Sequence, residues 1–172
     1  IIIKPASTTP QETIRVIELI CQATFGEGKA QKTLPKGTVN IVTGPGGSVG
    51  EELLRNPRIR RIAFTGSTPI GRHVMEVAGR EIKRVTLELG GSDPFTVMPS
   101  ADVEAASRVA VKARTINNGQ SCIAAKRFLV HERVADEFTR RFVEGMRALR
   151  VGEPMAPETD IGLTPGRYRV QY

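Results

Sequence analysis

The sequence predicts an α/β fold built on parallel strands. Short apolar segments alternate along the chain with longer segments whose apolar residues recur at helical spacing. Glycines and prolines stand at the junctions between these segments. Parallel strands need a crossover connection, and helices that alternate with strands supply it. A chain of 172 residues is long enough for one domain with a sizeable core.

Composition narrows the class of protein. Hydrophobic residues make up 40% and charged residues 25%, which is ordinary for a soluble globular protein. The chain has two cysteines, which fits a reducing compartment, so we expect a cytoplasmic location. No apolar run approaches the roughly 20 residues that cross a bilayer. The net charge of +7 suggests nucleic-acid binding as a candidate function. The basic residues are spread along the chain, however, and aromatic residues make up only 5%. We therefore expect no nucleic-acid partner and no membrane partner.

The first half of the chain predicts three strand–helix repeats followed by a fourth strand. Thr9 and Pro10 indicate a helix start, with an N-cap residue followed by a proline at the first helical position. Apolar residues then follow at helical spacing as far as Cys21, which we expect to be a buried core thiol. The other elements expected here are strands at 1–4, 39–42, 59–64 and 85–89, and helices at 48–55 and from residue 68 onward.

The second half continues the same alternation. We expect Ser100 to cap a helix over 101–114, and a second helix to run from Val134 to about Gly152. Strands are expected at 95–98 and 127–130. Paired glycines interrupt the pattern just after Glu88, so we expect a domain change within 88–92.

One cysteine lies in a polar, glycine-containing loop. Cys122 ends the stretch NNGQSC at 117–122, and with only two cysteines it cannot belong to a cysteine metal cluster. Upstream, Glu88 stands near the end of an apolar strand. A thiolate is a nucleophile and a carboxylate can activate a water, so the pair suggests covalent catalysis through a thioester. An inert loop cysteine and a solvent-facing glutamate are the alternatives. His73 and His131 fall in a helical pattern and at a strand end, and we expect neither to serve as a base.

A glycine-rich turn follows the second expected strand. The segment GPGGSVG at 44–50 lies between a strand and a helix, which is the context of a dinucleotide-binding turn. It is not a strict GxGxxG, because Val49 occupies the position of the third glycine. A plain strand-to-helix turn is the alternative reading of this segment.

Four motifs, in this order along the chain, resemble the aldehyde dehydrogenase superfamily. They are IKPAS at 3–7, FTGS at 64–67, ELGG at 88–91 and GQSC at 119–122. The resemblance runs from residue 1 to about Gly162 and is greatest to NAD(P)-dependent succinate-semialdehyde dehydrogenases. It implies a Rossmann-type parallel sheet with helices. It also implies the later half of an NAD(P)-binding domain over 1–89, the beginning of a catalytic domain over 90–162, and a divergent or truncated tail over 163–172.

The resemblance also implies a reaction, in which an aldehyde, with succinic semialdehyde favoured, is oxidised to the carboxylate by NAD or NADP. Cys122 would be the nucleophile and Glu88 the general base. Ser7 stands where NAD-preferring members often carry glutamate, so we expect NADP to be accepted. The cofactor-binding residues implied by the resemblance are Lys4, Ser7, Gly44, Phe64, Thr65, Gly66, Ser67 and Leu89. No metal site is expected.

Two expectations concern the chain as a whole. In the family, an asparagine that helps to hold the substrate oxyanion lies upstream of the segment matching Lys4. We therefore expect this chain to be a fragment that is inactive alone, and the full-length protein to be a homo-oligomer. A non-catalytic dinucleotide-binding or interaction module is the alternative, and Cys122→Ala would leave the function of such a module intact.

Overall fold

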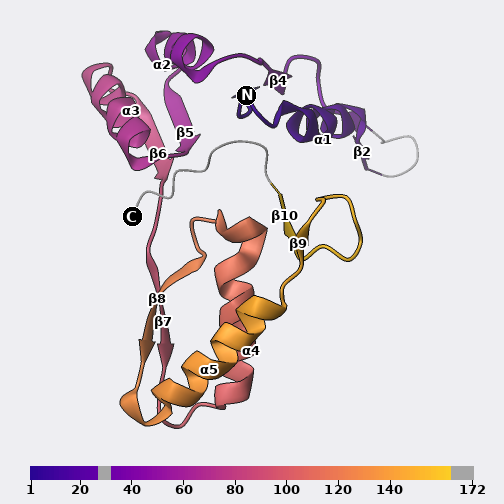
Figure 1. Cartoon of the computed structure of the whole chain (residues 1–172). Coiled ribbons are helices and arrows are strands. Elements are labelled where there is room, and N and C mark those ends of the chain that lie inside the picture. The colour runs from indigo at the N-terminus through magenta and orange to yellow at the C-terminus, as the bar shows by residue number, and fades with distance from the viewer. Residues whose placement is uncertain (27–31, 164–172) are drawn as a thin grey trace. The chain divides into compact units, whose positions relative to one another are not determined.

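The computed structural model describes residues 1–26 and 32–163, and the chain divides into two compact units after Glu88 (Figure 1). Among the described residues, the strands pair two by two. The pairs β1–β4, β5–β6, β7–β8 and β9–β10 are parallel, and only β2–β3 is antiparallel. The predicted α/β class with parallel strands is confirmed. The assignment of the two units to a cofactor domain and a catalytic domain stays a prediction.

The first unit alternates strands and helices. Its described elements are β1 (Ile2–Ile3), α1 (Pro10–Gln22), β2 (Thr24–Phe25), β3 (Lys32–Thr33), β4 (Asn40–Ile41), the π-helical turn η2 (Gly46–Gly50), α2 (Glu51–Arg55), β5 (Arg61–Thr65), α3 (Thr68–Arg80) and β6 (Arg84–Glu88).

The core of this unit forms between β5, β6 and the helices α2 and α3. Successive side chains of a strand point to opposite faces, so one face of β5–β6 turns apolar residues toward the helices. Ile62, Phe64, Val85 and Leu87 of that face pack against a buried cluster of Leu54, Val74, Val77 and Ala78. Because the strands are parallel, their carboxyl ends meet at one edge, where Thr65 is the register partner of Glu88.

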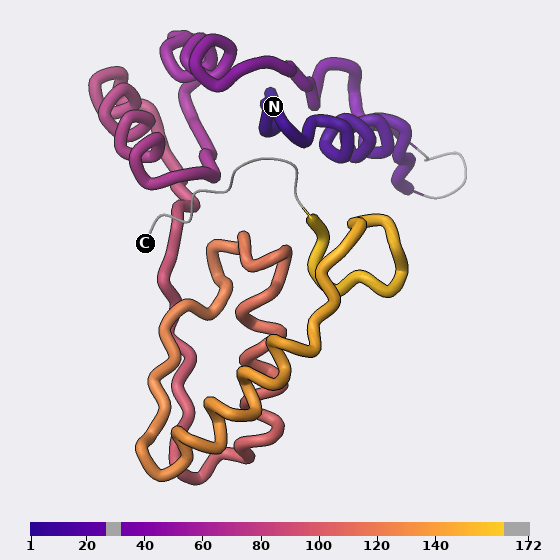
Figure 2. Tube along the Cα trace, in the orientation of Figure 1, coloured from indigo at the N-terminus to yellow at the C-terminus, as the bar shows by residue number. Residues whose placement is uncertain are grey.

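The second unit begins with a strand and carries two long helices. Its described elements are β7 (Asp93–Val97), α4 (Val103–Thr115), the 3-10 turn η3 (Ile116–Gly119), β8 (Ala125–Val130), α5 (Glu132–Ala148), β9 (Val151–Gly152) and β10 (Ile161–Gly162). Helix α4 is the crossover between the parallel strands β7 and β8, and it packs beside α5 (Figure 2). Val97, Ala110 and Phe138 form the buried core.

The prediction that Cys21 is a buried core thiol is wrong. The Cys21 side chain is exposed, and Ile17 is the one buried residue of α1. The neighbouring strands β1 and β4 have two residues each, so they offer too little surface to cover the last turn of the helix. The helical spacing of the apolar residues predicted α1 correctly. It did not predict how much of the helix is covered by neighbouring strands.

The prediction that Ser100 caps the fourth helix is also wrong. Asp102 is the N-cap residue, and its side chain accepts a hydrogen bond from Ala105 N at 3.0 Å. Ser100 lies instead in a turn closed by the hydrogen bond from Ala101 N to Met98 O. In the described residues, no helix is both long enough and apolar enough to cross a membrane.

Candidate active site

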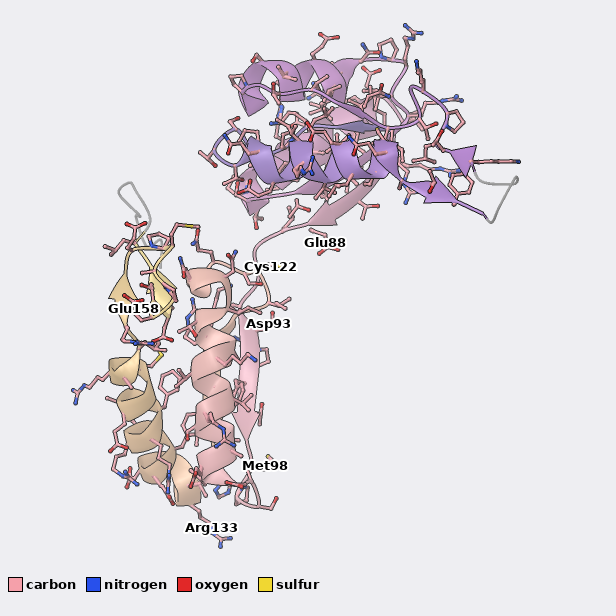
Figure 3. The ribbon with its side chains drawn as sticks, turned by 90° about the vertical axis from the view of Figure 1, so that its right-hand side faces the viewer. Glu88, Asp93, Met98, Cys122, Arg133 and Glu158 are labelled. Carbon is pink, nitrogen blue, oxygen red and sulfur yellow. The ribbon has the colours of Figure 1, made fainter. Side chains whose placement is uncertain are left out.

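Cys122 lies at the tip of a tight turn between η3 and β8. The turn is closed by Ala124 N, which donates to Ser121 O at 3.1 Å, and both Cys122 and Ile123 are exposed. Within the described residues, Cys122 N–H has no acceptor. Figure 3 shows Cys122 at the same end of the second unit as Asp93, where β7 begins. The turn therefore presents a thiol and a free backbone donor on one residue.

Left-handed backbone conformations lead into this turn. Asn117 and Asn118 have φ values of 50° and 56°, and Gly119 has a φ of 75°. Asparagine and glycine tolerate this region better than other residues, which explains why they occur here. The Asn118 side chain also pairs with the backbone of Gly162, donating to its carbonyl and accepting from its N–H at 3.3 Å each.

Two basic side chains of β8 tie the cysteine turn to the segment before β7. Lys126 Nζ donates to Gly91 O at 2.6 Å and to Cys122 O at 3.4 Å. Arg127 Nε donates to Ser92 O at 2.8 Å. A Cβ built on Gly91 would stand 3.0 Å from Cys122 O, so a larger residue at position 91 would push the two backbone segments apart. Gly91 of the ELGG motif and the turn of GQSC thus lie side by side.

Three predicted cofactor residues converge in the first unit. The half-buried Lys4 Nζ donates to Gly44 O at 3.1 Å and also to Pro5 O at 2.5 Å. The hydroxyl of Ser7 donates to the same Gly44 carbonyl at 3.1 Å. These residues follow the parallel strands β1 and β4, and ligands of open α/β sheets bind at the carboxyl ends of such strands.

The glycine-rich turn owes its shape to contacts of its own residues. Gly44 has a φ of 143°, and a Cβ there would stand 2.5 Å from Val49 Cγ2. Val49, which departs from the GxGxxG pattern, therefore fills the space beside Gly44. The next glycine that matters is Gly50, because the aliphatic stem of Lys4 lies beside it, with Lys4 Cδ 4.0 Å from a Cβ built on Gly50.

A second turn joins β5 to α3. A Cβ on Gly66 would stand 2.5 Å from Phe64 Cζ, so glycine is required beside this ring, which packs on the core. Ser67 is the N-cap residue of α3 but makes no side-chain capping bond. A hydroxyl and a helix N-terminus at the end of a parallel strand suit a phosphate group. Thr65 ends β5 with an exposed side chain.

Comparison with known proteins decides the family. The family model described as "Aldehyde dehydrogenase family" matches residues 1–164. The chain belongs to the aldehyde dehydrogenase family. A succinate-semialdehyde dehydrogenase [NADP(+)] of Mycobacterium avium is 49% identical over 161 residues, which is 94% of this chain and 32% of that protein. A Mycobacterium leprae protein of the same name is 47% identical over 94% of this chain and 33% of its own length. The chain thus spans about a third of these curated relatives.

Solved structures give the same family. An NADP-dependent enzyme of E. coli superposes with a TM-score of 0.83 at 39% identity, covering 93% of this chain and 31% of that one. Aldehyde dehydrogenase C of Pseudomonas syringae, a cysteine-to-alanine variant in complex with NAD+ and octanal, gives a TM-score of 0.85 at 31% identity. That match covers 96% of this chain and 32% of the other. The predicted resemblance to aldehyde dehydrogenases, and to succinate-semialdehyde dehydrogenases among them, is confirmed.

Two remaining predicted residues lie on either side of the division between the units. Glu88 ends β6 with an exposed side chain (Figure 3), and its carbonyl accepts from Gly66 N at 3.0 Å. The backbone hydrogen bond places the predicted general base next to the predicted phosphate turn. Leu89 is half-buried and begins the second unit. The pairing of Glu88 with Cys122 stays a prediction, as does a cofactor contact for Leu89.

Both histidines make side-chain contacts with residues that do not belong to the cysteine turn. His73 of α3 hydrogen-bonds Glu51 of α2, and this bond is the main reason that the pKa of Glu51 lies below its usual value. His131 is the N-cap residue of α5, and its Nδ1 accepts from Arg133 N at 3.2 Å. In the part of the chain that the structure describes, no cluster of His, Cys, Asp and Glu could hold a metal ion.

Sequence reasoning missed the basic residues that hold the cysteine turn. Lys126 and Arg127 lie just past the motif, in a strand where a basic residue would be taken for an ordinary solvated one. Their acceptors are backbone carbonyls 35 residues earlier in the chain, at Gly91 and Ser92. A carbonyl acceptor leaves no mark in a side-chain pattern, and only the fold brings the partners together.

Proposed function

We propose that this protein oxidises an aldehyde to a carboxylate with NAD or NADP, using Cys122 as the nucleophile and Glu88 as the general base. The observation that carries the proposal is the cysteine turn. In a chain of the aldehyde dehydrogenase family, it presents an exposed thiol beside a backbone N–H without an acceptor among the described residues. The Pseudomonas syringae enzyme in complex with octanal is a cysteine-to-alanine variant, as expected where a cysteine attacks the aldehyde.

The first step forms a bond between Cys122 Sγ and the aldehyde carbon. The carbonyl π electrons move to oxygen, and the resulting oxyanion accepts a hydrogen bond from Cys122 N–H. A bound nicotinamide cofactor would supply the acceptor for the hydride that leaves this carbon. The carbon bound to Cys122 is then at the oxidation level of a thioester.

The second step releases the acid. Glu88 takes a proton from water, and the hydroxide formed attacks the thioester carbon. The C–S bond breaks and its electron pair returns to Cys122 as thiolate. Aldehyde, water and oxidised cofactor are consumed, and carboxylate, reduced cofactor and two protons are formed. The exposed carboxylate at the end of β6 can exchange its proton with solvent between turnovers.

The residues of the first unit fit a dinucleotide. Lys4 and Ser7 bring an ammonium group and a hydroxyl to the Gly44 carbonyl, which suits the adenosine ribose. Gly66 has no room for a Cβ, and the Ser67 hydroxyl makes no capping bond. A bare backbone position next to a hydroxyl suits the pyrophosphate. Ser7 adds no negative charge that would repel a 2′-phosphate, so we propose NADP as a cofactor, with NAD also accepted.

We propose succinic semialdehyde as the substrate. Mycobacterial relatives at 47–49% identity are named succinate-semialdehyde dehydrogenase [NADP(+)].

Burst kinetics test the mechanism on the protein as it occurs in its source. With succinic semialdehyde and NADP+, we expect Cys122→Ala to form no reduced cofactor. Glu88→Gln should still form one equivalent per active site and then stop, because the thioester forms but is not hydrolysed. Steady turnover by Cys122→Ala would contradict the proposal. No turnover by the parent protein would favour the non-catalytic binding module instead. Unimpaired turnover by Glu88→Gln would remove Glu88 from the base role alone.

A further inference from the structure

We infer that Arg114 is a positioning residue for the Cys122 turn, an inference that rests on the proposed function. Arg114 lies in the last turn of α4 and is half-buried. Its Nη1 donates to Ala125 O at 2.7 Å and its Nη2 donates to Gly119 O at 2.8 Å. These two carbonyls stand three residues after and three residues before Cys122. One planar guanidinium group therefore fixes the distance between the two ends of the turn.

The backbone at Gly119 is adapted to this contact. A Cβ on Gly119 would stand 2.7 Å from Arg114 Nη2 and 3.2 Å from Arg114 O. Glycine is thus needed twice, for the φ of 75° and for the close approach of the guanidinium group. The two requirements at one residue show that the loop conformation and the arginine contact belong together.

The loop that carries Cys122 is held in place by hydrogen bonds more than by packing. A pocket of about 280 Å³ lies at the back of the loop, lined in part by Arg114, Gly119, Leu149 and Val151. A loop backed by an open pocket is not held by a close-packed core. Among residues 1–26 and 32–163, Arg114 has no carboxylate partner within ion-pair distance. Its charge is directed wholly at the two carbonyls.

The two hydrogen bonds require the two separate nitrogens of a guanidinium group, and a positive charge alone does not replace them. Lysine would bring a positive charge to the same place and could bridge two carbonyls, as Lys126 does, but from one nitrogen and without the fixed plane and spacing of two guanidinium nitrogens. Arg114→Lys should therefore loosen the turn while leaving α4 and its core contacts in place. A nucleophile displaced by about 1 Å can lose about a hundredfold in rate.

The test compares Arg114→Lys with Arg108→Lys in the protein as it occurs in its source. Arg108 is an exposed residue of the same helix whose side chain makes no hydrogen bond or ion pair within the described residues, so the control makes the same change away from the turn. For Arg114→Lys we expect kcat for succinic semialdehyde to fall about tenfold to a hundredfold, with KM for NADP+ and the melting temperature nearly unchanged. Amide hydrogen exchange over 119–125 should quicken. Arg108→Lys should change none of these quantities.

The outcomes separate this inference from the proposed function. Unchanged kcat and unchanged exchange in Arg114→Lys would overturn the positioning role. A fall in melting temperature that accompanies the whole loss of activity would also overturn it, because Arg114 would then serve stability alone. If the parent protein forms no acyl-enzyme, the proposed function fails, whereas the exchange measurement still reports whether Arg114 holds the turn.

Discussion

The carbonyl oxygen of Cys122 lies 3.0 Å from the point where a Cβ on Gly91 would stand. Gly91 belongs to the glycine pair that follows Glu88, and Cys122 belongs to the loop after α4. The Nζ of Lys126 bridges the two carbonyls from the next strand. The glycine of the first motif thus makes room for the turn of the second, which gives a physical reason for both motifs to occur in one chain.

Replacing Gly91 tests this contact. In Gly91→Ala the added Cβ would also stand 3.2 Å from Asp93 Oδ1, so the turn or the strand entry has to shift. We expect a loss of about tenfold to a hundredfold in the rate of acyl-enzyme formation. The matched control is Gly79→Ala, because a Cβ on Gly79 meets nothing within 4 Å. Equal rates for Gly91→Ala and the parent protein would show that the contact is unimportant.

Charge at position 7 should set the cofactor preference. In Ser7→Glu a carboxylate would stand beside Gly44, where it would repel a 2′-phosphate. We expect kcat/KM with NADP+ to fall at least about tenfold relative to kcat/KM with NAD+. Ser7→Gln has the same size without the charge and should change the ratio far less. If the ratio of the two kcat/KM values changes equally in both variants, the size of the side chain and not its charge would be the cause.

The helix cap found by the structure predicts a contrast between two neighbouring residues. Asp102→Ala removes the acceptor for Ala105 N and should lower the free energy of unfolding by about 0.5–2 kcal/mol. Ser100→Ala should change that free energy little, since Ser100 lies in the preceding turn and does not cap α4. Urea unfolding followed by circular dichroism measures both. A larger loss for Ser100→Ala would contradict the cap assignment.

Glu51 should link stability to pH. The hydrogen bond from His73 lowers the pKa of Glu51 below 4.5, with Arg55 contributing less and burial opposing the shift. A carboxyl group with a depressed folded-state pKa stabilises the fold above its unfolded-state pKa. That contribution is lost as the pH falls through the folded-state value.

The pH dependence of the urea midpoint tests this linkage from neutral pH down to about pH 3. Glu51→Gln should be less stable than the parent protein at neutral pH, and the difference should shrink below the ordinary glutamate pKa. Glu52→Gln is the control on the same helix, and it keeps an acceptor for Asn56 Nδ2. A Glu51→Gln difference that stays constant across this range would exclude the charged pair as its cause.

Local patterns in the sequence predicted most of the fold because their causes are local. The helix starts expected at Pro10 and at residue 68 match those of α1 and α3, and strand alternation gave β5 and β6 to within two residues at each end. The burial of Cys21 failed because it depended on how much strand surface lies beside α1. The pairs β2–β3 and β9–β10 were not predicted, since their strands have two residues each and give no periodic signal.

In the candidate site, too, the sequence predicted some residues and missed others. Motifs identified Cys122, Glu88 and Ser67, because chemistry fixes which side chains occur there. The residues that hold the turn donate hydrogen bonds to backbone carbonyls. Their residue type therefore does not reveal this role in the sequence. Arg114 and Lys126 could be found only once the fold had brought Gly119, Ala125 and Gly91 beside them.

Mass spectrometry of the acyl-enzyme tests the central claim most directly. The protein as it occurs in its source, carrying Glu88→Gln, is mixed with succinic semialdehyde and NADP+, quenched in acid and digested. We predict a mass increase of one succinyl group on the peptide that contains Cys122, lost on treatment with hydroxylamine, and none on the peptide that contains Cys21. A protein that reduces NADP+ with the Cys122 peptide unmodified, or with the succinyl group on another residue, would contradict the account.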